Sequence, residues 1–278
     1  MSARDAQQEA QRVSQRENAQ TRFSGYARPL VDEALRHTAH PNPEADDLHK
    51  LRVALRRLRT LLWAWRPLLG RELAELDRAF LKRAAAAAGE ARDWDIAIAL
   101  LHAIGTDAAH ERLQAARSQA RLSACATLAG ADLRHALRAM LHKLNRELNT
   151  SPRRTSVKRL ARERVRAARR SLLKRMRRAR HARQDEYAAW HDVRKGAKKL
   201  RYLLEFFEPI LPRREIRRLK PLKKLQNRFG LLNDALATEQ LLLNHREVFS
   251  DDANANAALA ALRRERKRRR RAAAKLLG

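Results

Sequence analysis

Four side chains that could bind phosphate recur at helical spacing in one segment of the chain. A histidine at position 49 is followed by cations three, seven and ten residues later, which gives His49, Arg52, Arg56 and Arg59. On an α-helix these positions form one stripe, about 80° wide and about 15 Å long. Guanidinium groups bind phosphate oxygens in a bidentate manner, and ammonium groups add point charges. The stripe therefore predicts a site for a multivalent anion.

The same stripe occurs a second time. Residues 190–211 align without gaps on residues 48–69, and the second stripe consists of His191, Arg194, Lys198 and Arg201. Like charges at this spacing repel one another in an isolated helix. Retention of the pattern in both copies therefore favours an anionic partner over a merely solvated helix face.

A shorter element follows each stripe after about twenty residues. It reads Gly-x-x-(Arg/Asn)-Asp and runs from Gly89 to Asp93 in the first copy and from Gly230 to Asp234 in the second. We expect each glycine at a helix end, and each aspartate either to cap the next helix or to orient a nearby arginine. Mainly structural roles are the favoured interpretation.

The elements that carry these residues are predicted to be helices only. Good helix formers dominate the composition, and Gly and Pro occur eight times each. Leu51, Leu55, Leu58 and Leu62 form an apolar face beside the first stripe. The positions of capping residues, glycines and prolines predict helices over 5–39, 43–66, 71–88, 91–104, 107–129, 131–148, 152–183, 186–208, 213–229, 234–248 and 254–277.

Prolines set several of these limits. Asn42-Pro43 and Ser151-Pro152 each predict a helix start, and Pro67 and Pro209 each predict a stop or a bend. We infer a tandem duplication with halves near 1–149 and 150–278. The predicted fold is all-α, with two helical bundles related by a pseudo-twofold axis around a basic central groove or pore, and residues 1–278 form one domain.

The charge balance agrees with an anionic partner. The 278 residues include 62 Lys and Arg against 31 Asp and Glu, a formal net charge of +31, while the hydrophobic fraction of 44% suits a folded core. A single cysteine, Cys125, excludes an intramolecular disulfide and is expected to be a small apolar filler. No secretory signal or membrane span is recognised, so we expect a cytoplasmic, soluble protein.

Other side chains near the stripes are ranked second as anion ligands: Arg57, Arg83, Lys195, Lys199 and Lys224. Lys82 and Lys223 are left open between the site and solvent. The aromatic residues Trp63, Trp65, Phe206 and Phe207 are expected in the core. The dense cations of 153–183 and 263–271 are interpreted as solvated helix faces.

The motifs H-x-x-R-x-x-x-R-R-x-R and H-x-x-R-x-x-x-K-K-x-R-Y, each followed by G-x-x-R-D or G-x-x-N-D, resemble the CHAD domain, the conserved histidine α-helical domain. The resemblance spans nearly the whole chain. It implies two helical bundles around a basic cavity, binding of inorganic polyphosphate and association with polyphosphate granules. It assigns the lining role to the eight stripe residues and adds Tyr202 to the second rank. The run Ala84–Ala88 departs from the second copy and indicates that the halves are not equivalent.

Two other function classes are compatible with parts of this composition or need to be excluded by motif. Non-specific RNA or DNA binding is the main alternative, because a strongly basic protein can bind any phosphate backbone. No catalytic or metal-binding motif is recognised, so we expect no enzyme activity, no metal and no cofactor. We therefore predict non-catalytic polyphosphate binding, strengthened below neutral pH by His49 and His191. The preferred chain length and the oligomeric state are not predicted.

Overall fold

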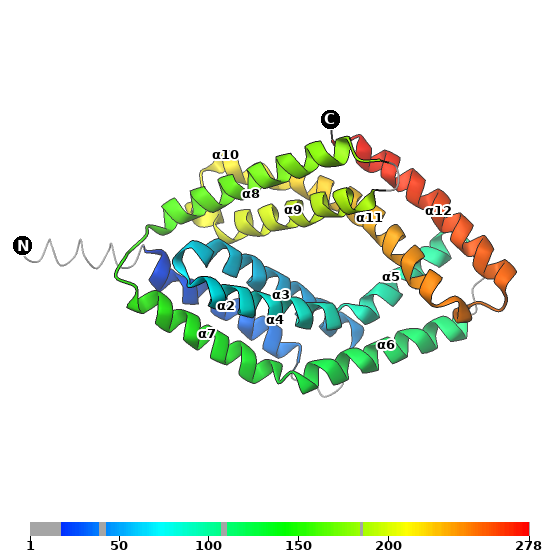
Figure 1. Cartoon of the computed structure of the whole chain (residues 1–278), viewed down its shortest axis with the longest axis horizontal. Coiled ribbons are helices and arrows are strands. Elements are labelled where there is room, and N and C mark those ends of the chain that lie inside the picture. Colours follow the sequence, from blue (N-terminus) through cyan, green and yellow to red (C-terminus); the bar gives the residue numbers. More distant parts are fainter. Residues whose placement is uncertain (1–17, 39–42, 107–109, 184–185, 278) are drawn as a thin grey trace, which may run out of the picture.

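The computed structural model describes residues 18–38, 43–106, 110–183 and 186–277. Figure 1 labels their helices. In chain order the elements are α2 (Ala19–Arg36), α3 (Ala45–Trp65), η1 (Arg66–Leu68), α4 (Arg71–Ala87), α5 (Glu90–Ala103), α6 (His110–Gly130), α7 (Leu133–Thr150), α8 (Val157–Arg180), α9 (Tyr187–Phe206), η2 (Glu208–Ile210), α10 (Arg213–Ile216), α11 (Leu219–Asn244), η3 (Arg246–Val248) and α12 (Asp252–Ala274). The predicted all-α fold class is confirmed.

The helices form two groups that meet through α3 and α9. In the first group α3 packs between α2 and α4, and α2 also packs on α7. In the second group α9 packs between α8 and α11. Figure 1 shows these groups on opposite sides of the molecule, joined at one end by α5, α6, α11 and α12. Because α3 and α9 are in contact, the two basic stripes lie near each other. The pseudo-twofold relation of the halves stays a prediction.

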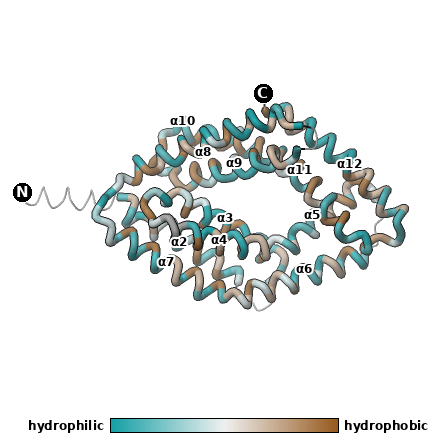
Figure 2. Tube along the Cα trace, viewed as in Figure 1, coloured by the Kyte–Doolittle hydropathy of each residue, from teal (hydrophilic) through white to brown (hydrophobic). Residues whose placement is uncertain are grey.

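One face of each helix forms the core. All four leucines of the predicted apolar face, Leu51, Leu55, Leu58 and Leu62, are buried. Figure 2 shows hydrophobic and hydrophilic positions alternating along the helices, as one packed face and one solvated face require. The first stripe is therefore carried on a helix that the leucines hold in place.

An aromatic cluster ties the two groups together. Trp65 of α3 lies 5.7 Å from Phe207, which follows α9, measured between ring centroids. The indole N–H of Trp65 also donates a hydrogen bond of 2.7 Å to the carbonyl oxygen of Ala19. Trp65, Phe206 and Phe207 are buried, as predicted.

A second, smaller cluster lies where α5, α6, α11 and α12 meet, and it includes Trp94, Phe249 and Leu262. It closes the end of the molecule away from α7. None of the helices in the described ranges is both long and apolar enough to cross a membrane.

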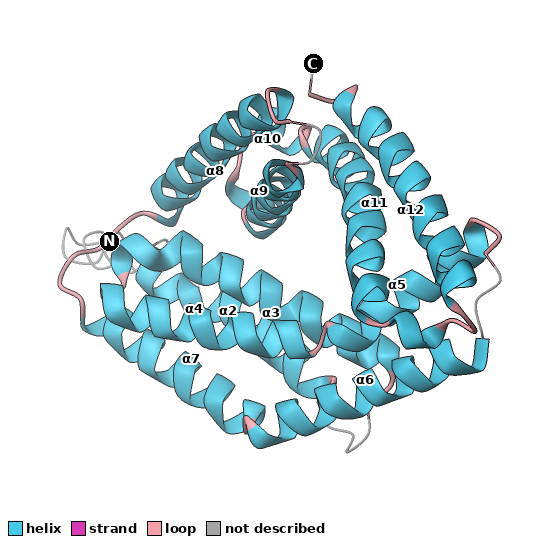
Figure 3. Cartoon of the chain, turned by 45° about the vertical axis from the view of Figure 1, so that its right-hand side comes forward, coloured by secondary structure: helices cyan, strands magenta, loops and turns pink. Residues whose placement is uncertain are grey.

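Figure 3 shows helices joined by loops, with no strand in the described part of the chain.

The start of α8 differs from the prediction. Ser151-Pro152 does not begin a helix, and α8 starts only at Val157. The reason is a long-range tie: the N–H of Ala19 donates to the carbonyl oxygen of Thr155 at 2.7 Å, and the N–H of Thr155 donates to the side-chain oxygen of Gln20 at 3.2 Å. These bonds hold the segment extended.

Of the other proline predictions, the structure confirms the two helix ends and contradicts the helix start. Pro67 and Pro209 lie where α3 and α9 end and short 3-10 helices begin, which confirms both stops. Pro43 does not begin α3, because the next residue has extended backbone and the helix starts at Ala45. Asn42 lies outside the described residues.

The predicted break between 213–229 and 234–248 is wrong. Residues 219–244 form one continuous helix, α11, and Gly230 lies inside it. The apolar positions Leu222, Leu225, Phe229 and Leu232 continue across the glycine and are buried. This packing outweighs the cost of a helical glycine, about 1 kcal/mol. Gly89, by contrast, does separate α4 from α5.

Candidate anion-binding site

The two stripes line a common cavity of about 650 Å³ between the two helix groups. From α3 it receives Arg52, Arg56 and Arg59, and from α9 it receives His191, Arg194 and Lys198. The remaining walls come from α4 and α8. The full lining is Arg52, Arg56, Arg59, Thr60, Trp63, Glu75, Arg78, Ala79, Lys82, Ala85, Ala86, Arg175, His191, Arg194, Lys195, Lys198, Lys199 and Tyr202.

A smaller cavity of about 190 Å³ adjoins the first one. Arg52, Arg56, Arg194 and Lys198 line both cavities. The smaller cavity also receives His49 of the first stripe. The four shared cations, Arg52, Arg56, Arg194 and Lys198, therefore lie at the junction of the two spaces. Seven of the eight predicted stripe residues line one space or the other. We refer to the two spaces together as the central cavity.

The central cavity is strongly cationic. Among the described residues of the larger space, ten are arginine or lysine, and Glu75 is the single carboxylate. Glu75 forms an ion pair of 2.8 Å with Arg66, which is not part of the lining. The field in the cavity therefore favours a multivalent anion.

Burial and mutual repulsion lower the pKa values of these cations. Burial, reinforced by the neighbouring Arg194, Arg56 and Arg52, lowers the pKa of Lys198 to about 7. Burial and Arg52 lower the pKa of Arg56 to about 10. Each shift reports the cost of holding a positive charge there, and an anion would offset that cost.

The aspartates of the short elements orient the arginines, which is one of the two roles predicted for them. Asp93 pairs with Arg52 at 3.6 Å, and Asp234 pairs with Arg194 at 3.8 Å. The two arginine side chains are 18% and 16% exposed, so they keep little freedom.

Gly89 has a specific steric role beside Arg52. A Cβ atom at this position would lie 1.6 Å from Nη1 of Arg52, so the guanidinium occupies the space that a side chain would need. At Gly230 a Cβ atom would lie 3.9 Å from Nε of Arg194, an ordinary contact. Only the first copy therefore needs glycine for its arginine.

The two histidines have different partners. Nδ1 of His191 is hydrogen-bonded to the amide oxygen of Asn233. Nδ1 of His49 is buried and finds no hydrogen-bond partner among the described residues, and Arg92 lies where the second copy has Asn233. Burial, followed for His49 by repulsion from Arg92, lowers the pKa of both rings. Any gain in binding from their protonation is therefore shifted to lower pH.

Arg201 is the stripe residue that lines neither cavity. It pairs with Glu205 at 3.2 Å, and its guanidinium lies 4.9 Å from the ring of Tyr202. Arg57, ranked second, likewise stacks on Tyr202 and Phe206 and does not line the cavity.

The remaining second-rank residues divide into two sets. Lys195, Lys199 and Tyr202 line the larger space, whereas Arg83 and Lys224 are exposed and line neither. Of the two lysines left open, Lys82 lines the cavity and Lys223 does not.

Several lining residues were not predicted. Arg78 shares a helix face with Lys82, four residues on, and this spacing could have pointed to both. Arg175 belongs to the Arg-rich segment interpreted as solvated, but it reaches the cavity from α8. Trp63, expected in the core, is half-buried and lines the cavity, with the guanidinium of Arg164 3.6 Å from its ring centroid.

Among the described residues no group of three or more His, Cys, Asp and Glu could hold a metal ion.

A family model described as CHAD domain matches residues 25–243 of the chain. A search of curated proteins finds no match.

Two solved structures have a similar fold. The crystal structure of the CHAD domain from the plant Ricinus communis is 21% identical, with a TM-score of 0.74, over 93% of this chain and 91% of that one. PptA from Streptomyces chartreusis is 18% identical, with a TM-score of 0.69, over 93% of this chain and 99% of that one.

Proposed function

The chain belongs to the CHAD domain family, and from this premise we propose that it binds inorganic polyphosphate in the central cavity without catalysing a reaction. The family is linked to polyphosphate binding. The observation that carries the proposal is that cations from both copies of the repeat line one cavity, whose larger space has a single carboxylate among its described residues.

Polyphosphate suits this lining chemically. It is a linear chain of like charges, and each phosphate offers oxygens to guanidinium and ammonium donors. The cations that line both spaces would bind the polyphosphate chain at the junction: Arg52, Arg56, Arg194 and Lys198. Arg59, Arg78 and Lys82 would contact it farther along the larger space. Release of counterions would add to the binding free energy.

Single-stranded nucleic acid is the rival ligand, and Trp63 argues against it. Proteins that bind single strands stack bases on open aromatic faces. Here the guanidinium of Arg164 lies 3.6 Å from the Trp63 ring centroid, and Nζ of Lys199 lies 4.5 Å from it. A base would have to displace one of these cations.

In a cell, a preference for polyphosphate over nucleic acid would locate the protein at polyphosphate granules.

The test compares two variants with equal loss of charge. The cavity variant replaces Arg52, Arg56, Arg194 and Lys198 with Ala. The control replaces four exposed cations that line none of the cavities: Arg170, Lys174, Arg177 and Arg271. Labelled polyphosphate and a single-stranded oligonucleotide of equal charge are titrated against each at constant salt.

We expect the cavity variant to lose at least 100-fold in polyphosphate affinity, since each charge-assisted hydrogen bond contributes about 1.5–3 kcal/mol. The control should stay within a few-fold of the wild type. Equal losses for both ligands, or equal losses in both variants, would show that net charge alone drives binding. Circular dichroism of each variant checks that the helices remain.

A further inference from the structure

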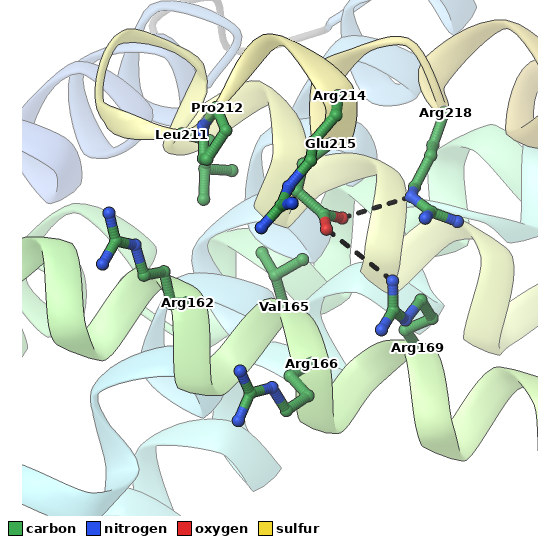
Figure 4. A pocket seen from close by; sticks show the side chains of 9 residues that line it. All are labelled: Arg162, Val165, Arg166, Arg169, Leu211, Pro212, Arg214, Glu215 and Arg218. Atoms are coloured by element: carbon green, nitrogen blue, oxygen red, sulfur yellow. Dashed lines mark ion pairs between the residues drawn. The ribbon is translucent and has the colours of Figure 1, made fainter.

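A second basic pocket lies between α8 and the segment that carries α10, as Figure 4 shows. Its volume is about 340 Å³. None of its residues lines the central cavity. The lining is Arg162, Val165, Arg166 and Arg169 from α8, with Leu211, Pro212, Arg214, Glu215 and Arg218 from the facing segment. We refer to it as the outer pocket.

The charges of the outer pocket are unbalanced. Among its described residues, five arginines surround one carboxylate, that of Glu215. Glu215 is shared between Arg169 at 3.7 Å and Arg218 at 3.3 Å. The other three, Arg162, Arg166 and Arg214, form no side-chain ion pair or hydrogen bond with a described residue. In Figure 4 the side chain of Arg214 points from its own segment toward α8.

Helix geometry separates this pocket from the central cavity. Arg162, Arg166 and Arg169 fall within about 60° on α8 and span about 10 Å along it. Arg164 and Arg175 lie on roughly the opposite side of the helix, and there Arg164 stacks on Trp63 and Arg175 lines the central cavity. The outward arginines are therefore not a continuation of the central site.

A solvated helix face would not require cations from a second segment. Arg214 and Arg218 approach from the facing segment, and the side chains of Val165 and Leu211 form an apolar wall that is buried. Holding five guanidinium groups around one carboxylate has an electrostatic cost that a bound anion would offset.

We propose that the outer pocket binds a short anion that carries two or more phosphate groups, independently of the central cavity. A length of about 10 Å along α8 exceeds that of one phosphate, and guanidinium forks match phosphate oxygens in pairs. The three unpaired arginines supply the primary contacts, and Arg169 and Arg218 supply charge that Glu215 only partly neutralises. The site does not require that the central cavity bind polyphosphate.

Isothermal titration calorimetry with inorganic tripolyphosphate at constant salt tests the proposal. The outer variant replaces Arg162, Arg166 and Arg214 with Ala. Its control replaces Arg170, Lys174 and Arg177, three exposed cations of the same helix that line no cavity. We expect the outer variant to lose one binding event, weakened by roughly 30-fold or more. The control should retain it, and a single Arg166→Glu substitution should reproduce the loss.

A variant of the central cavity distinguishes failure of this proposal from failure of the proposed function. In Arg56→Ala/Lys198→Ala the outer binding event should persist, whatever happens to the central one. The outer pocket is rejected if the outer variant and its control bind tripolyphosphate alike. It is also rejected if the outer variant loses affinity for a single-stranded oligonucleotide but not for tripolyphosphate, because the arginines would then serve a nucleic-acid backbone.

Discussion

Arg56 on α3 and Lys198 on α9 occupy matching positions in the two copies of the repeat, and both are half-buried among cations. The pKa of Arg56 falls only to about 10, so its guanidinium stays charged at every physiological pH. The pKa of Lys198 falls to about 7, so its ammonium is half neutral near that pH. The same surroundings therefore give one copy a permanent charge and the other a titratable one.

The far ends of the stripes differ as well. Four residues after Arg59 the first copy has Trp63, which lines the cavity with it. Four residues after Arg201 the second copy has Glu205, which pairs with that arginine at 3.2 Å. The last arginine of the stripe therefore faces the cavity in the first copy and is paired with a carboxylate in the second.

Removing the junction cations of one copy at a time should give the largest contrast. At pH 8.5 Lys198 is mostly neutral, so Arg52→Ala/Arg56→Ala should weaken polyphosphate binding by about 100-fold and Arg194→Ala/Lys198→Ala by only about 10-fold. At pH 6 the two losses should converge. Fluorescence titration at both pH values measures this, and equal losses at pH 8.5 would remove the distinction between the copies.

The glycines should give the next largest contrast. Gly89→Ala places a methyl group where the Arg52 guanidinium lies, so polyphosphate affinity should fall by roughly tenfold. Gly230→Ala should leave affinity unchanged and raise the free energy of unfolding by about 0.5–1 kcal/mol, because Ala is the better residue inside a helix. Denaturant unfolding and the same titration measure both effects. A matching affinity loss in Gly230→Ala would contradict the steric argument.

The pH dependence of affinity isolates Lys198. Polyphosphate favours the charged ammonium, so affinity should fall several-fold as pH rises through about 7. Lys198→Arg should flatten that fall. Between about pH 7 and 10.5 the unfolded chain holds a proton that the folded chain has released, so the free energy of unfolding should rise with pH over this range. If the Arg variant retains the whole fall, another group carries it.

The smallest effect concerns Glu205. Glu205→Gln releases Arg201 from its ion pair and should raise polyphosphate affinity by about two- to threefold, as expected from the strength of a partly exposed pair. The mirror substitution, Trp63→Glu, should place a carboxylate beside Arg59 and lower affinity. Competition titrations against the wild type resolve differences of this size. A loss of affinity in Glu205→Gln would mean that Glu205 positions Arg201 for the ligand.

Residues on one helix could be predicted, because their relation depends only on helical periodicity. The leucine face and the basic stripe of α3 follow from a spacing of 3.6 residues, and the structure has both on that helix. Glu205, at i+4 from Arg201, is a sequence signal for this ion pair. The fate of this arginine could therefore also have been inferred.

Residues on different helices could not be predicted in this way. Arg175 lines the cavity only because α8 packs beside α9. The late start of α8 depends on hydrogen bonds to Ala19 and Gln20, more than 130 residues away in sequence. Such contacts are set by tertiary packing, which local patterns do not record.

The tie between the start of α2 and the segment before α8 bears on how the chain folds. Gln20 bonds to the carbonyl oxygen of Arg153 and to the N–H of Thr155. During synthesis, α2 can make these bonds only after residue 155 has emerged from the ribosome. A fragment ending near residue 149 would lack them, together with the Trp65–Phe207 ring contact. We therefore expect the two repeats to fold as a single cooperative unit, with neither half stable alone.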